Sequence, residues 1–218
     1  MDYVIRIKIG ATLALLLGCS GTVTAAGDMS EQQGQEVFET IAGIGCKSCH
    51  GDFAEGDLGV GPFIRGATEG AIRAAIDATG EMNVIKSTIT DEQIEAVVAY
   101  VSYLGSMQVA RTLSKRGRFL PDAFATRPGT PIQLIVKNSG IQPATYHSDD
   151  MDIEPFSVAG RSTSSIEWNA PENEGDYSLY CTDCKLKDQF FVISVDANAP
   201  PYPGTVAATS TKPADDGM

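Results

Sequence analysis

A five-residue motif in the first half of the chain, Cys46-Lys47-Ser48-Cys49-His50, constrains its structure and chemistry more than any other feature. Two thiols three residues apart at the start of a helix lie on one side of it, and the next residue presents its imidazole beside them. Three reactive side chains are therefore held together by local backbone geometry alone. Any fold built around this motif must accommodate the group that they bind.

Three chemistries use a motif of this kind. C-x-x-C-H is the attachment signature of c-type haem, in which the thiols bond to the vinyl groups and the imidazole ligates the iron. A zinc site needs further Cys or His nearby, and the next histidine is His147. A thioredoxin-like redox pair lies in a βαβ pattern, whereas the surroundings here have helical periodicity. The sequence therefore predicts one covalent haem c, attached to Cys46 and Cys49 and ligated by His50.

The surroundings of the motif are predicted to be helical. Apolar residues recur with a period near 3.6 over 32–44 and again over 68–79. The third helix has the clearest boundaries, because Thr90 and Gln93 form a capping box at its start and Gly105 ends it.

Residues 31–105 resemble a small class I cytochrome c domain. The resemblance rests on the C-K-S-C-H motif, an intervening methionine, and Gly34, Phe38, Gly61, Pro62 and Tyr100. It implies that the Pro62 carbonyl accepts a hydrogen bond from the His50 ring and fixes its tautomer. It also implies that Met82 is the sixth iron ligand, although Asn83 stands where the family often has proline. A thioether ligand stabilises ferrous iron and, with both axial positions filled, favours electron transfer.

The second half of the chain has short β-rich runs separated by turn residues, which is typical of a sandwich or barrel. Residues 123–196 resemble a cupredoxin-like sandwich, because of the Pro-Gly-Thr-Pro turn at 128–131 and the Tyr-containing strand that ends at Cys181. The predicted fold class is therefore multidomain α plus β, an all-α cytochrome c domain followed by an all-β cupredoxin-like sandwich. The predicted boundaries are 27–105 for the cytochrome c domain, 106–122 for a basic linker, 123–196 for the sandwich and 197–218 for a disordered tail.

The resemblance makes Cys181 the match to a copper ligand of that family. An ordinary blue-copper site also needs two histidines, and His147 is the only histidine in this half. Three interpretations remain open for Cys181 and Cys184. They form a disulfide in an oxidising compartment, they join His147 with Met151 or Asp183 in a non-standard copper or zinc site, or they act as a labile redox pair.

The first 26 residues are predicted to be a signal peptide. Arg6 and Lys8 precede a short apolar run, and small residues follow. The segment 16–19 also resembles a bacterial lipobox, which would place a lipid anchor on Cys19. Cleavage after the small residues at 23–25 by ordinary signal peptidase is the other interpretation. Either site predicts a periplasmic or otherwise exported protein, with contact to the membrane only through a lipid anchor at Cys19.

The formal net charge of -12 argues against nucleic-acid binding. Most of the excess lies in residues 27–105, which have 13 acidic and 4 basic residues, so a redox partner with a basic face is expected. The predicted function is electron transfer by a mono-haem cytochrome whose β domain docks a partner or holds a second redox or metal centre. The alternatives are a redox subunit of a periplasmic oxidase or reductase, a copper-handling protein, and a haem sensor. The sequence shows no substrate pocket or catalytic base, which favours an electron carrier over an enzyme.

Overall fold

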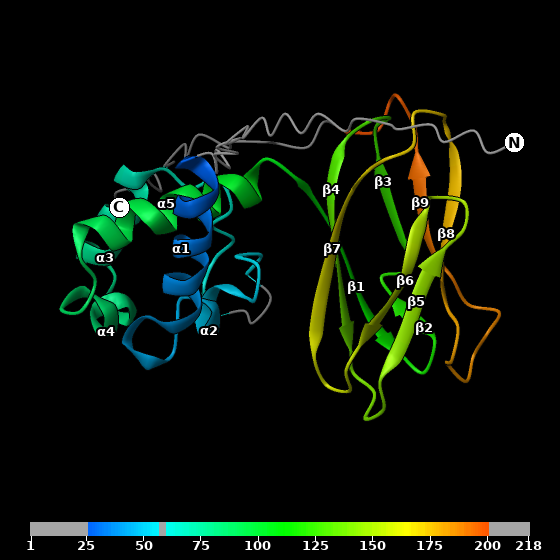
Figure 1. Cartoon of the computed structure of the whole chain (residues 1–218), viewed down its shortest axis with the longest axis horizontal. Helices are drawn as coiled ribbons and strands as arrows, with labels where there is room; N and C mark the ends of the chain where they lie inside the picture. The colour runs from blue at the N-terminus through cyan, green and yellow to red at the C-terminus, as the bar shows by residue number, and fades with distance from the viewer. Residues whose placement is uncertain (1–25, 57–59, 201–218) are drawn as a thin grey trace, which may run out of the picture.

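The computed structural model describes residues 26–56 and 60–200. In this part of the chain the helices precede the strands, and the two groups form separate bodies joined at the end of α5 (Figure 1). The predicted signal peptide and lipobox lie outside the described residues, apart from Ala26. None of the helices among the described residues has the length and apolarity needed to cross a membrane.

The helical part surrounds the motif and contains three longer helices. The helix predicted over 68–79 is present as α3, with Thr68 as its N-cap. The predicted capping box of Thr90 and Gln93 is present at the start of α5. Both predictions are confirmed. The first helix ends at Thr40, four residues earlier than predicted, and the chain then turns through Gly45. The helical elements are α1 (Ala26–Thr40), η1 (Ile41–Gly43), α2 (Lys47–His50), α3 (Glu69–Ala78), η2 (Gly80–Met82), α4 (Asn83–Lys86) and α5 (Asp91–Gly105).

Close packing of α1 on α5 forms the centre of the helical part. A Cβ atom on Gly34 would lie 2.0 Å from the Ala96 carbonyl oxygen, so only glycine allows this approach. The rings of Phe38 and Tyr100 meet across the same contact with centroids 5.5 Å apart. Three of the residues that carry the resemblance, Gly34, Phe38 and Tyr100, therefore have packing roles.

The strands form two sheets, which confirms the predicted β-sandwich (Figure 1). One sheet has the order β2-β1-β4-β7 and the other the order β3-β9-β8-β5-β6. Their inward faces enclose a second apolar core that includes Leu134, Tyr146 and Phe191. The strands are β1 (Gln108–Lys115), β2 (Arg118–Leu120), β3 (Ala123–Thr126), β4 (Pro131–Asn138), β5 (Ala144–Ser148), β6 (Ile153–Val158), β7 (Thr163–Asn169), β8 (Gly175–Cys181) and β9 (Phe191–Val195).

The prediction of a basic linker at 106–122 is wrong. This segment forms β1 and β2, and β1 pairs in parallel with the central strand β4. Its inward residues are Ala110, Thr112 and Ser114, which are small or polar but fully covered. The hydropathy of β1 therefore lacks the apolar–polar alternation that marks a half-buried strand. The exposed bases dominate the sequence pattern of this segment, which is why it was predicted to be a linker.

The predicted tail also begins too early. Residues 197–200 are described, and Ala199 is only 5% exposed. Its carbonyl accepts a hydrogen bond of 2.7 Å from Arg127 Nε, which ties this end of the chain to the sandwich. Residues 201–218 lie outside the described part of the chain.

A buried arginine joins the helical part to the sandwich. Arg65 is 6% exposed, and its guanidinium donates to the Phe53 carbonyl (3.1 Å) and to the Leu104 carbonyl at the end of α5. It also donates to Gln133 Oε1 on β4. A second bond, from the Tyr103 hydroxyl to the Glu167 carboxylate on β7, crosses the same boundary.

Candidate functional site

The short helix α2 holds the three side chains of the motif on one turn. The amides of Cys49 and His50 donate to the Cys46 carbonyl at 3.1 and 3.0 Å, which closes the turn on the first thiol. His50 is buried, with only 8% of the residue exposed. The geometry that the motif requires is thus set by hydrogen bonds within the motif itself.

The orientation of the His50 ring is fixed from outside the helix. Its Nδ1–H donates to the Pro62 carbonyl over 2.8 Å, the contact that the resemblance implies. A ring that donates from Nδ1 has its lone pair on Nε2, and such a second-shell bond makes that nitrogen a stronger metal ligand. Pro62 therefore leaves Nε2 of His50 as the atom available to a metal.

Gly61 allows the Pro62 carbonyl to reach the ring. Its amide donates to the Cys49 carbonyl over 2.9 Å. A Cβ at this position would lie 2.8 Å from both that carbonyl oxygen and His50 Nδ1, closer than real Cβ atoms approach. The Gly-Pro pair thus forms a backbone cradle against the imidazole, and a side chain at Gly61 would fill it.

The two thiols of the motif are not joined to each other. Cys46 and Cys49 are both free and partly exposed. Burial raises the pKa of the Cys46 thiol to about 11, so it is protonated at neutral pH and does not carry the reactivity of a thiolate. A C-x-x-C redox pair usually has a lowered thiol pKa, and Cys46 has the opposite shift.

Met82, the predicted sixth ligand, and Met107, the next methionine along the chain, both contact the helical core. Met82 ends η2 and is half-buried against the core cluster, whereas Met107 follows α5 and is buried. The Met107 carbonyl accepts from Arg65 at 3.4 Å, so its backbone belongs to the contact between the two parts of the chain. Met82 as the sixth ligand stays a prediction.

The residues present fit a covalent haem c. The set comprises two unbridged thiols on one turn, an imidazole with Nε2 as its free nitrogen, a glycine cradle that holds the ring, and the Met82 thioether at the end of η2, which packs on the helical core. The iron ligands in this set would be an imidazole and a thioether. Ligation by histidine and methionine is typical of cytochromes c.

Cys181 and Cys184 form a disulfide, with their Cα atoms 5.4 Å apart. Asp183 lies between them in sequence, and its two carboxylate oxygens accept bonds from the amide (2.8 Å) and hydroxyl (3.1 Å) of Thr145. Among the described residues, the side chains of Cys181, Asp183 and Cys184 form the one group whose ligand atoms lie close enough to share a metal ion, all within 4.8 Å. In the oxidised state the two sulfurs are bonded to each other and offer no thiolate.

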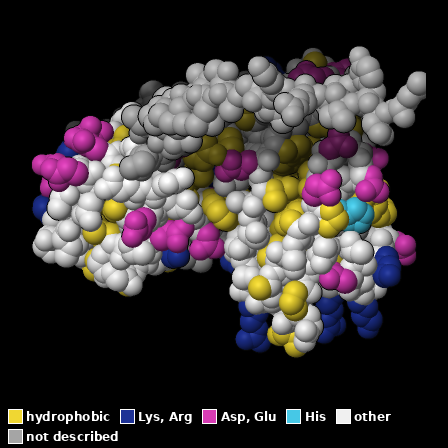
Figure 2. Space-filling view, in the orientation of Figure 1, with side chains coloured by type: hydrophobic (Ala, Val, Ile, Leu, Met, Phe, Trp, Pro, Cys, Tyr) yellow, Lys and Arg dark blue, Asp and Glu magenta, His cyan; other side chains and the backbone are white. Residues whose placement is uncertain are grey.

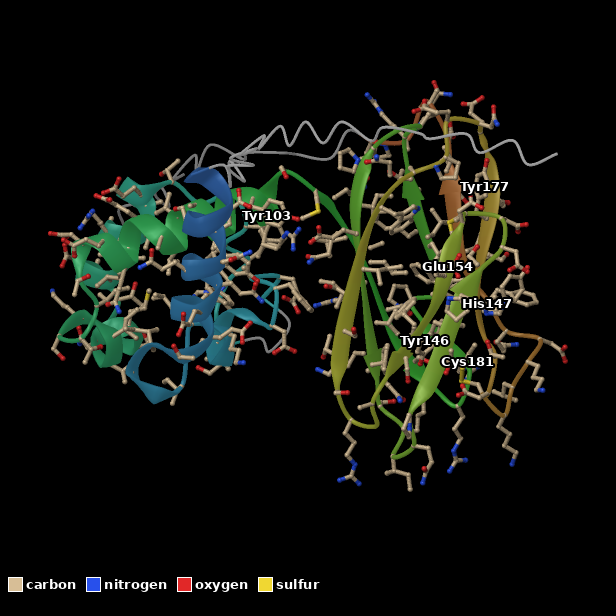
Figure 3. All side chains as sticks on the ribbon, in the orientation of Figure 1. Tyr103, Tyr146, His147, Glu154, Tyr177 and Cys181 are labelled. Atoms are coloured by element: carbon tan, nitrogen blue, oxygen red, sulfur yellow. A yellow bond between two sulfur atoms is a disulfide. The ribbon has the colours of Figure 1, made fainter. Side chains whose placement is uncertain are left out.

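The structure does not bring His147 into this group. Cys181 pairs with Tyr146, whose side chain is buried in the sandwich core, whereas His147 pairs with Tyr180. Because successive side chains of a strand point to opposite faces, His147 faces away from Cys181 (Figure 3). Its Nδ1 lies 3.0 Å from the Thr182 hydroxyl and its ring packs on Tyr180. The predicted combination of His147 with both cysteines is therefore wrong for this structure.

Arg65 is a residue that the sequence analysis missed. It is one of only four bases in residues 27–105 and follows the Gly-Pro pair by three positions. A base in an acidic segment close to the motif could have marked Arg65 as a candidate. Its partners could not have been predicted, because Leu104 and Gln133 are 39 and 68 residues away. Sequence periodicity does not contain such long-range contacts.

No protein-family model and no curated protein matches the chain. Similar solved structures include a copper-containing nitrite reductase from Thermus scotoductus (16% identity, TM-score 0.38), matched over 44% of this chain and 32% of that one. Another is auracyanin from the photosynthetic bacterium Roseiflexus castenholzii (13% identity, TM-score 0.35), matched over 42% of this chain and 98% of that one. A third is a copper nitrite reductase from Nitrosomonas europaea (10% identity, TM-score 0.36), matched over 46% and 52%. The chain spans about a third of the first of these proteins. Similarity at this level carries no argument about function, and the strand order of this chain alone establishes its sandwich.

Proposed function

We propose that this protein is an exported mono-haem c-type cytochrome that transfers single electrons. Cys46 and Cys49 hold the haem covalently, His50 is the proximal ligand and Met82 the distal ligand. The observation that carries the proposal is the hydrogen bond from His50 Nδ1 to the Pro62 carbonyl, 2.8 Å long, beside two free thiols on the same helical turn. A structural histidine needs no such combination.

The bound group supplies a one-electron change at its iron, and the residues of this chain set the conditions for it. Pro62 holds the proton on Nδ1 of His50, so the ring does not rotate or change tautomer as the charge of the site changes. The covered position of His50 lowers the local dielectric constant, which strengthens the influence of nearby charges on the potential. His50 and Met82 would together occupy the ligand positions of the iron and exclude exogenous ligands, which would favour electron transfer over gas binding or catalysis.

The acidic surface of the helical part fits a redox partner with a basic face. Asp and Glu side chains are spread over this part of the molecule in Figure 2. Their field would steer a basic partner and make association fall as salt rises. The sandwich then serves as a docking or supporting module, since its two cysteines are joined in a disulfide.

Copper binding is the second candidate, and one observation favours it. The grouping of Cys181, Asp183 and Cys184 within 4.8 Å would become a set of metal ligands if the disulfide were reduced. In this case the protein would be a copper-handling protein or a two-centre relay. Copper analysis of the oxidised and reduced protein separates this candidate from a structural disulfide.

Haem attachment can be tested with a matched pair of double variants expressed with the cytochrome c maturation machinery. Cys46→Ser with Cys49→Ser removes the proposed attachment sites, and Cys181→Ser with Cys184→Ser removes the other C-x-x-C pair. On a denaturing gel stained for haem peroxidase activity, the wild type and the second variant should retain haem, and the first should lose it. Haem retained by the first variant would refute the proposal.

A further inference from the structure

Four loops meet at one end of the sandwich. Backbone hydrogen bonds join them: Leu186 N to Arg116 O (3.0 Å), Ser139 N to Ser114 O (2.9 Å) and Arg161 N to Gly140 O (2.8 Å). Loops from both sheets therefore form one continuous surface, which we call the basic end. It consists of residues 115–118, 139–143, 159–162 and 182–190.

The basic end carries an unusual excess of positive charge for a molecule with a net charge of -12. Its acidic residues are Asp183 and Asp188 alone. Its six exposed bases form no ion pair with any described residue. Lys and Arg side chains project from this end in Figure 2. These bases are Lys115, Arg116, Arg118, Arg161, Lys185 and Lys187.

Aliphatic side chains lie among these bases. Ile141 is 71% exposed in the β4–β5 loop, and Leu186 is 46% exposed in the β8–β9 loop. Leu186 stands directly between Lys185 and Lys187. An apolar residue flanked by bases at a loop tip is suited to the boundary between lipid headgroups and acyl chains.

The hollow between these loops is also lined by bases. A cavity of about 370 Å³ is bordered by Lys115, Arg116 and Lys185, with Ile141 at its edge. Asp183 also borders it, but both oxygens of its carboxylate accept bonds from Thr145. The cavity thus offers three cationic side chains to an anionic headgroup.

The charge distribution of the whole molecule orients this surface. β5 and β7 run away from the basic end, so the turns that follow them lie at the opposite end, where Asp149, Asp150, Asp152, Glu172 and Glu174 are exposed. The helical part is acidic as well. An anionic surface would repel both regions and attract only the basic end.

We propose that the basic end docks this protein on a membrane that contains anionic phospholipid. Its bases contact headgroup phosphates, and Ile141 and Leu186 enter the interface. Lipid fits better than an acidic protein because lysine is depleted from protein–protein interfaces, whereas bases beside exposed aliphatic side chains suit anionic headgroups and the acyl boundary below them. Lys185 and Lys187 flank Leu186, and Phe190, which is 39% exposed, is the one exposed aromatic residue of the basic end. Docking in this way leaves the acidic helical part free for a soluble partner.

Sedimentation with vesicles tests this inference. The full chain with Cys19→Ser, which removes any lipid anchor, is mixed with phosphatidylcholine vesicles that either contain or lack phosphatidylglycerol. We expect binding only to the anionic vesicles and its loss as salt rises. Because the inference concerns the sandwich alone, it can fail while haem attachment stands, and the reverse is also true.

Two single variants provide a matched comparison. Lys187→Glu should weaken vesicle binding at least fivefold, about the contribution of one base near an anionic surface. Lys86→Glu changes the net charge equally but lies on the helical part, and it should have little effect. Ile141→Ser with Leu186→Ser should also weaken binding, with the salt dependence unchanged.

Three results would overturn the proposal: no binding to anionic vesicles, equal binding to uncharged vesicles, or equal effects of Lys187→Glu and Lys86→Glu. Salt-sensitive binding to soluble polyglutamate without binding to anionic vesicles would also overturn it, because it would assign the basic end to an acidic protein. Circular dichroism of each variant checks that the sandwich is folded.

Discussion

At the scale of single residues, the His50 ring depends on a glycine that makes no side-chain contact. Gly61 brings the backbone of the Gly-Pro pair against the imidazole, and Pro62 supplies the acceptor for Nδ1. The spacing of the motif at 46–50 predicts that its three reactive side chains lie together. It does not predict the cradle, because His50 and Pro62 are twelve positions apart and meet only in the folded chain. The distance between ring and carbonyl is a property of the loop and not of the motif.

Replacement of Gly61 with alanine is expected to disturb the site. The added Cβ would lie 2.8 Å from His50 Nδ1, and such overpacking costs about 1–3 kcal/mol. Denaturant unfolding of the haem-loaded protein and its haem content should both show a loss. Gly70→Ala is the control, since a Cβ there meets nothing within 4 Å and Gly70 lies in α3. It should leave stability unchanged or raise it. A Gly61→Ala protein as stable and as fully loaded as the Gly70→Ala protein would contradict the role of the cradle.

At the scale of elements, the sequence predicted α3, α5 and the later strands because their patterns are local. Thr90 and Gln93 bond to each other within one turn, and β9 has an apolar inward face at Phe191, Ile193 and Val195. The strand β1 was missed because Thr112 and Ser114 occupy its inward positions. The sequence did not show that His147 and Cys181 lie on opposite faces of the sheet. That follows from the pairing of β5 with β8, in which Cys181 is opposite Tyr146 and not His147.

The disulfide of β8 and its following loop should control access to metal. The oxidised protein is expected to bind no copper tightly, because both sulfurs are bonded to each other. Reduction should cost about 2 kcal/mol of stability, as for closure of a very short loop, and should expose two thiols. Thiol titration and copper analysis before and after reduction measure both effects. Stoichiometric copper in the oxidised protein would contradict the structural role of the disulfide.

At the scale of the whole molecule, the two parts of the chain are joined through Arg65 and through Tyr103. Neither residue belongs to a recognised motif, and each connects segments more than sixty residues apart. The change from helices to strands could be predicted from the sequence pattern, but the contact between the two parts could not. Long-range pairing leaves no periodic signal in the sequence.

Replacement of Arg65 with methionine should weaken the contact between the two parts. The Leu104 carbonyl and Gln133 Oε1 would lose a charged donor, and a buried acceptor left unpaired costs about 1–3 kcal/mol. Calorimetry should show a lower Tm and separate transitions for the helical part and the sandwich. The exposed control Arg161→Met should behave like the wild type. A single unshifted transition in Arg65→Met would show that the two parts are joined by other contacts.

The bond from Tyr103 to Glu167 predicts a dependence on pH at the alkaline end. This hydrogen bond and burial raise the pKa of the Tyr103 phenol to about 12. A raised folded-state pKa gives a stabilisation that is fully present below the ordinary tyrosine pKa of about 10 and is lost as pH rises through about 12. Ultraviolet titration should show a late phenolate step whose amplitude falls by one tyrosine in Tyr103→Phe, and one late phenolate should move to lower pH in Glu167→Gln. Burial also raises the pKa of Tyr100 to about 12, so its phenolate should remain in both variants. A late step of unchanged amplitude and position in both variants would contradict the role of the Tyr103–Glu167 bond.

The central claim is that the helical part is a haem c domain with His50 and Met82 as axial ligands. The most direct measurement is a pyridine haemochrome assay of the mature protein, with visible spectra of the ferric and ferrous states and of the Met82→Ala and Met107→Ala variants. We expect one haem c per chain and a weak long-wavelength sulfur–iron band in the ferric state, lost in Met82→Ala and kept in Met107→Ala. A protein that takes up no covalent haem would contradict the claim. A band lost only in Met107→Ala would move the distal ligand to the residue after α5.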